Sequence, residues 1–223
     1  MAFSEVEAFL TGEPWVPFEN RPKLELPSPS ERRALFEEGR FDLANRARAQ
    51  MTRGVSYREF KVGCSVLAWH PTEGPILYDA YNFKPVKKEE KGEAKRCAER
   101  NAIRFAEQDG CVKIIAIVTA SREKSVSEKY DHDVLHPCEE CRSLFRTVPA
   151  IDQDTIVYNI LDTTPPLPDE EIAQHRKAVM DFVASTSLPL PDNTIIHPPL
   201  NTEFDIMAEE RTMQELQELY REK

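Results

Sequence analysis

Short apolar runs alternate along the middle of the chain with longer segments of helical periodicity. The apolar runs have the length and residue types of strands and occupy residues 60–70, 75–83, 112–121 and 155–162. A Pro-Thr-Glu-Gly segment separates the first two runs and supplies a turn, so these two runs predict a β-hairpin. The third run is continuously apolar, which indicates a buried strand.

Three segments beside these runs have the spacing and end signals of helices. Residues 28–54 begin with serines suited to capping, carry apolar residues at helical spacing and end at Gly54, with Gly39 as a candidate break. Residues 97–110 place small and apolar side chains on one face, and residues 136–148 form a second such segment beginning at a proline. Strands and helices therefore alternate, as in α/β proteins.

This order predicts one α/β domain with an extension at each end. The domain is expected over residues 32–162. Residues 1–31 carry several prolines among aromatic side chains, which predicts an extended arm. Residues 163–223 predict a C-terminal helical extension, with a helix near 168–184 and an acidic final helix over 207–223.

Composition and charge narrow the classes of partner. A chain with 40% hydrophobic and 30% charged residues has the composition of a water-soluble globular protein, without a membrane span. Its net charge of -10 disfavours nucleic acid polymers and anionic membranes, so a small-molecule partner is expected. The N-terminus lacks a basic region followed by an apolar run, so we expect a cytoplasmic protein.

Three of the five cysteines are spaced as metal ligands. Cys97 begins one predicted helix, while Cys138 and Cys141 begin another with Cys-x-x-Cys spacing, and helix N-termini favour thiolates. Three thiolates can hold a zinc ion and leave its fourth position open for water. Glu99 follows Cys97 by two residues and is suited to move protons between such a water and a substrate.

Four short motifs together resemble the cytidine deaminase family. They are Cys-Ala-Glu-Arg at 97–100, Pro-Cys-Glu-Glu-Cys-Arg at 137–142, Phe-Lys-Val-Gly at 60–63, and an asparagine at position 82. The three-cysteine version is similar to the branch that acts on nucleosides, and the likeness spans residues 57–161. It implies a three-layer α/β/α sandwich around a mixed five-stranded sheet, with N- and C-terminal extensions.

The resemblance also implies an activity and a set of site residues. The implied reaction is zinc-dependent attack of hydroxide on C4 of a cytosine-like ring, with release of ammonia and with Glu99 as the proton shuttle. Phe60, Asn82 and Ala98 are the positions implied to contact the substrate. Arg100 and Arg142 match arginines of the family that hydrogen-bond the cysteine sulfurs and offset their charge. The small three-cysteine members are tetramers, so a homo-oligomer, dimer or tetramer, is expected.

Two departures from the family pattern keep alternatives open. Lys84 stands where the nucleoside enzymes have a ribose-binding glutamate, which favours an acidic group on the substrate, and His136 stands where a serine is common. The first alternative is deamination of an aminonucleoside antibiotic such as blasticidin S, whose deaminases also lack that glutamate. The second is a non-catalytic zinc-containing binding module. A polynucleotide-editing enzyme is disfavoured by Cys97 and the acidic net charge.

Overall fold

The computed structural model describes most of the predicted domain and the end of the chain. The described residues are 22–56, 60–84, 96–123, 126–127, 130–131, 134–163 and 206–221, with scattered positions between 170 and 181. Residues 1–21 of the predicted arm lie outside this set. The helix expected near 168–184 lies largely outside it as well.

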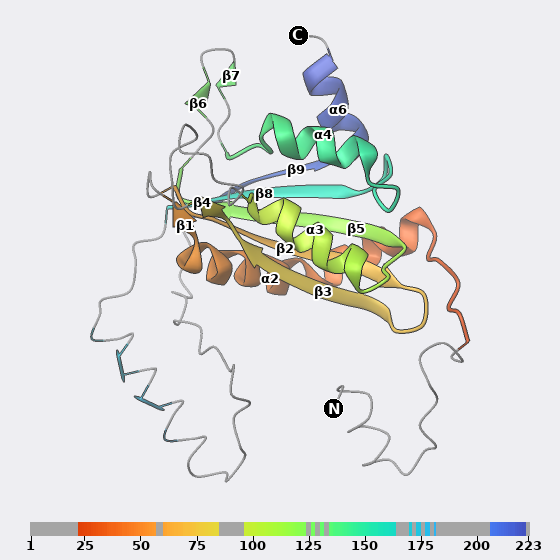
Figure 1. Ribbon diagram of the computed structural model, residues 1–223, viewed down its shortest axis with the longest axis horizontal. Helices are drawn as coiled ribbons and strands as arrows, with labels where there is room; N and C mark the ends of the chain where they lie inside the picture. Colours follow the sequence, from red (N-terminus) through yellow and green to blue (C-terminus); the bar gives the residue numbers. More distant parts are fainter. Residues whose placement is uncertain are drawn as a thin grey trace.

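A mixed five-stranded sheet forms the centre of the molecule (Figure 1). Its strands, in spatial order, are β3 (Gly74–Tyr81), β2 (Val62–His70), β5 (Lys113–Ser121), β8 (Ile156–Asp162) and β9 (Ile206–Thr212). Only the β5–β8 pair is parallel; the other three neighbouring pairs are antiparallel. The predicted hairpin is confirmed as β2 and β3, whose turn includes Gly74 at a φ of 78°.

Helices cover both faces of the sheet, which confirms the predicted three-layer α/β sandwich (Figure 1). Helix α2 (Pro29–Arg53) packs on one face, and α3 (Ala98–Gln108), α4 (Glu139–Thr147) and α6 (Met213–Arg221) pack on the other. The remaining short strands lie outside the main sheet: β1 (Val55–Ser56), β4 (Phe83–Lys84), β6 (Val126–Ser127) and β7 (Tyr130–Asp131).

Helix α2 runs without a break through Gly39. Ser28 caps its N-terminus in a reciprocal arrangement with Glu31, as expected for a capping box. The helix lies very close to β2, because a Cβ atom on Gly63 would collide with the carbonyl oxygen of Ala47 and the backbone nitrogen of Met51. The glycine of the Phe-Lys-Val-Gly motif is therefore a packing requirement between α2 and the sheet.

The C-terminal segment differs from the prediction. Residues 207–212 were expected to be helical, but they form β9, which pairs with β8 along its whole length. The expectation of one helix over 207–223 is therefore wrong at its start, and α6 begins at Met213. The segment is rich in glutamate, which favours helix locally, but the free edge of β8 offers a complete ladder of backbone partners. The buried side chains of Met213 and Leu216 then join the core beneath α4.

Within the described residues, no helix has both the length and the apolar surface needed to cross a bilayer. The five cysteines are all free thiols.

Candidate metal centre and active site

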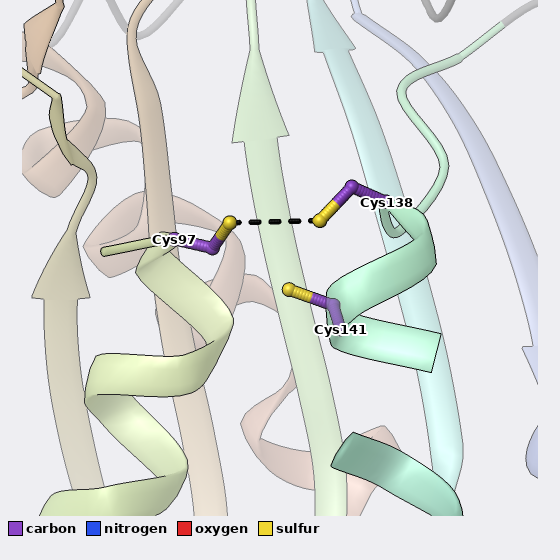
Figure 2. Close-up of side chains that lie close together, drawn as sticks. All are labelled: Cys97, Cys138 and Cys141. Atoms are coloured by element: carbon purple, nitrogen blue, oxygen red, sulfur yellow. Dashed lines mark hydrogen bonds between the residues drawn. The ribbon is translucent and has the colours of Figure 1, made fainter. Parts of the chain in front are cut away.

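The folded chain brings the three predicted metal ligands together (Figure 2). Cys97 is the N-cap of α3, Cys138 is the N-cap of α4, and Cys141 lies in the first turn of α4. The Sγ atoms of Cys97 and Cys138 are 3.5 Å apart, and all three Sγ atoms lie within 4.8 Å of one another. A tetrahedral zinc ion with Zn–S bonds of about 2.3 Å separates its sulfurs by about 3.8 Å. The cluster is therefore suited to zinc.

The three thiols perturb one another strongly. Hydrogen bonds from Cys141 and Cys97 lower the pKa of the Cys138 thiol, because they stabilise its thiolate. The corresponding hydrogen bonds raise the pKa values of Cys97 and Cys141, which act as donors. Cys97 and Cys141 are buried, whereas Cys138 is exposed. Two ligands are thus shielded from water and one faces the solvent.

Glu99 lies in the first turn of α3, only two residues from Cys97, and its side chain is buried. Burial, followed by the negative charge of Cys138, raises the pKa of Glu99 to about 7. A carboxyl group with such a pKa can both accept and release a proton near neutral pH.

A small open cavity lies beside the cysteines. Glu99, Cys97 and Cys138 line it, together with Phe60, Val62, Asn82, Lys84, Ala98, Leu135 and His136. All three positions expected to contact a substrate therefore surround the metal cluster. The cavity, the cluster and the carboxyl group form one site.

Comparison with known families identifies this arrangement. The model of the cytidine and deoxycytidylate deaminase zinc-binding region matches residues 40–157, more than half of the 223-residue chain. The chain belongs to this deaminase family. Its family and its cysteine cluster make it a zinc-dependent deaminase.

Solved structures similar to this deaminase include two bacterial enzymes. Cytidine deaminase from Burkholderia pseudomallei is 22% identical, with a TM-score of 0.40, over 53% of this chain and 82% of that one. Cytidine deaminase from Mycobacterium leprae is 22% identical, with a TM-score of 0.37, over 52% of this chain and 83% of that one. No curated protein matches the chain.

Asn82 of the deaminase lines the cavity, but its side-chain amide already binds the backbone. Its Oδ1 accepts a hydrogen bond of 2.9 Å from the Val62 amide, and its Nδ2 donates one of 2.8 Å to the Phe60 carbonyl. The side chain is fully buried. These bonds fix the start of β2 and hold Phe60 in the cavity wall.

The two arginines expected near the sulfurs have different surroundings. Arg100 is exposed and, among the described residues, forms no hydrogen bond with a cysteine sulfur. Arg142 donates a hydrogen bond of 2.7 Å to the carbonyl oxygen of Pro137, next to Cys138. Its guanidinium group also lies 4.0 Å from the ring centroid of Tyr220 in α6.

Lys84 brings a positive charge to the wall of the deaminase cavity. It is partly buried in the cavity wall one residue after Phe83, which pairs with Arg96 beside Cys97. Burial alone would lower its pKa, but the charges of Cys97, Cys138 and Glu99 and a hydrogen bond with Cys97 raise it. Lys84 therefore stays protonated beside the cysteine cluster.

The sequence did not reveal the surroundings of His136. Its Nδ1 lies 2.9 Å from the Tyr220 hydroxyl, and its Nε2 lies 3.1 Å from a carboxylate oxygen of Glu209. Burial lowers the pKa of His136, although Glu209 opposes this shift, and a neutral ring with hydrogen on Nε2 suits both partners. In the sequence, Met213, Leu216, Leu219 and Tyr220 have the spacing of one apolar stripe on the final helix, and this spacing was the signal that the helix would pack on the domain.

Proposed function

We propose that this deaminase hydrolyses the exocyclic amine of a cytidine-like aminopyrimidine nucleoside, giving ammonia and the uridine-type product. The observation that carries the proposal is the position of Glu99, which lines the same cavity as Cys97 and Cys138 of the cysteine cluster. A structural zinc site needs no buried proton carrier beside it. A hydrolytic deaminase does, because water must lose protons and the leaving amine must gain them.

Cys97, Cys138 and Cys141 would hold the zinc, which supplies Lewis acidity and lowers the pKa of a bound water. Glu99 takes a proton from the attacking water and delivers it to the ring nitrogen next to C4. It then carries a second proton to the amine. The C4–O bond forms, the C4–N bond breaks, and ammonia leaves. The pKa of Glu99 near 7 suits both directions of transfer.

The cavity wall supports a planar aromatic substrate. Phe60 offers an aromatic surface for a pyrimidine, and Ala98, at the start of α3, leaves room beside Glu99. We propose that Asn82 acts chiefly by holding Phe60 and Val62, since both ends of its amide bind their backbone. Arg142 is proposed to help position Cys138 through its hydrogen bond to the neighbouring Pro137. The exposure of Arg100 gives its predicted role no support.

Lys84 favours a second candidate substrate class within the same chemistry. A partly buried ammonium in this cavity suits a phosphate or carboxylate on the sugar better than a neutral hydroxyl. Nucleoside monophosphates and aminonucleoside antibiotics with an acidic sugar, such as blasticidin S, belong to this class.

We also propose that the protein is cytoplasmic and forms homo-oligomers. The five cysteines are free thiols, which persist in a reducing compartment such as the cytoplasm. A second cavity at the β3 edge carries the exposed aromatic side chains Phe83 and Phe105, which are suited to contact a second copy of the chain. Light scattering of the full chain measures the assembly; a monomer at micromolar concentration would contradict this part of the proposal.

Ammonia release tests the proposed reaction. Zinc-loaded wild type would be incubated with cytidine, deoxycytidine, CMP, cytosine and blasticidin S, alongside Glu99→Gln. Glu107→Gln is the matched control, because Glu107 is an exposed carboxylate on the same helix. We expect turnover of at least one compound by the wild type and the control, and a loss of about 100-fold or more in Glu99→Gln. A zinc-loaded wild type that releases no ammonia from any compound would favour the non-catalytic binding module.

A further inference from the structure

The segment from His136 to Cys138 connects the C-terminal part of the chain to the metal cluster. Residues 134–138 form no helix or strand, so regular backbone hydrogen bonds do not fix their positions. Cys138, at the end of this stretch, is the exposed member of the cysteine cluster. On one side Cys138 is held by α4, because its carbonyl oxygen accepts a hydrogen bond of 2.9 Å from the Arg142 amide. On the other side, its position depends on contacts made by the loop.

Two residues of the C-terminal segment supply these contacts. Glu209 of β9 and Tyr220 of α6 bind the two ring nitrogens of His136, which is buried. Both bonds reach across more than 70 positions of sequence, from elements that follow the cysteines. The imidazole thus links the ligand loop to a strand and to a helix at once.

Tyr220 also contacts the loop by a second route. Arg142 stacks on its ring at 4.0 Å and donates to the carbonyl oxygen of Pro137. The residues on either side of the His136–Pro137 peptide bond are therefore both tied to Tyr220. Removal of this side chain would release the loop at two points.

We propose that the segment Ile206–Arg221 is a clamp that positions the His136–Cys138 loop, and through it Cys138, for the metal. Glu209 and Tyr220 are its positioning residues, and they act through His136 and Arg142 without touching the metal. The inference rests on zinc binding by the three cysteines and not on the identity of the substrate. Outer contacts of this kind change metal affinity by about 10–100-fold when they are removed.

Zinc release from the loaded full-length protein to an excess of a chromogenic chelator tests the clamp without any substrate. The informative variants are Glu209→Ala and Tyr220→Phe; the latter keeps the ring that stacks on Arg142 but loses the bond to His136. Glu210→Ala is the matched control, because Glu210 neighbours Glu209 on the same strand but pairs with Arg33 of α2. We expect release about tenfold faster in both informative variants, and a rate close to wild type in the control.

Thermal unfolding of the metal-free proteins separates positioning from general stability. A clamp that acts on the loop speeds zinc release well below the unfolding temperature, whereas a merely structural contact lowers the melting temperature and leaves release unchanged. Wild-type release rates in both informative variants would overturn the proposal, as would equal acceleration in Glu209→Ala and Glu210→Ala. Failure of the proposed deamination would leave faster release intact, so the two ideas can fail separately.

Discussion

The Sγ atoms of Cys97 and Cys138 lie 3.5 Å apart, although the two residues begin different helices on the same face of the sheet. Each sulfur sits at a helix N-terminus, where free N–H groups and the helix dipole favour a thiolate. With Cys141 in the first turn of α4, the pair forms a cluster whose spacing suits zinc but which leaves no fourth cysteine to close it. This relationship underlies the chemistry of the deaminase.

Replacement of one clustered cysteine is expected to abolish tight zinc binding. Cys141→Ser removes a buried ligand, and metal analysis after dialysis should find about one zinc per chain in the wild type and almost none in the variant. Cys111→Ala is the control, since Cys111 contacts Tyr78 away from the cluster. Equal zinc content in Cys141→Ser and the wild type would show that Cys141 is not a ligand.

Neutralisation of Lys84 is expected to change substrate preference. If its ammonium binds an acidic group on the sugar, Lys84→Gln should lower kcat/KM for phosphorylated or carboxylated substrates by about tenfold or more, because a charge-assisted hydrogen bond is lost. Neutral nucleosides should be affected less. Lys61→Gln, at an exposed position near the start of β2, is the control. An equal loss of kcat/KM for all substrates would show instead that Lys84 acts on the cysteine cluster and not on the sugar.

The close contact of α2 with β2 predicts opposite effects of two glycine substitutions. Gly63→Ala should destabilise the protein by about 1–3 kcal/mol or more, because the new methyl group would collide with the α2 backbone. Gly39→Ala should stabilise it by about 0.5–1 kcal/mol, since Gly39 lies inside the helix and a Cβ there meets Leu43 at an ordinary 3.9 Å. Urea unfolding measures both. Similar values for the two variants would contradict the packing described for β2.

Loss of a buried ion pair is expected to destabilise the protein more than loss of an exposed ion pair on the same helix. Arg48 donates a hydrogen bond of 2.7 Å to Asp162 at the end of β8, and both side chains are almost completely buried. Asp162→Ala should cost about 3–5 kcal/mol of unfolding free energy, because it leaves a buried guanidinium without its carboxylate. Arg46→Ala, which removes a more exposed pair with Asp42 and Asp79, should cost about 1 kcal/mol or less. Chemical denaturation monitored by circular dichroism measures the unfolding free energy of both variants. Equal losses would contradict the prediction that the buried pair contributes more.

Local patterns in the sequence were enough to predict the central elements and the metal ligands, and the resemblance of short motifs to a known family predicted the chemistry. The hairpin of β2 and β3, the buried strand β5 and the helices α3 and α4 follow from apolar runs, turn residues and helical spacing, and the structure confirms each of them. The Cys-x-x-Cys spacing predicted two ligands of the metal cluster, and the place of Cys97 at the start of a second predicted helix supplied the third; the structure brings all three together. Glu99 could be placed beside the cluster because it follows Cys97 by only two residues.

Contacts between distant segments were decided only by the tertiary structure. The glutamate-rich residues of β9 favour a helix when considered alone, yet they form a strand because β8 leaves an edge to be paired. The same pairing carries Glu209 and Tyr220 to His136, a contact that no local pattern encodes. Asn82 was expected to contact the substrate, but only the fold showed that its amide is bound to the start of β2. Sequence thus determined what lies within one element or one short motif, where periodicity and spacing fix geometry; the docking of the C-terminal segment depended on backbone partners and side-chain contacts that exist only once the sheet has formed.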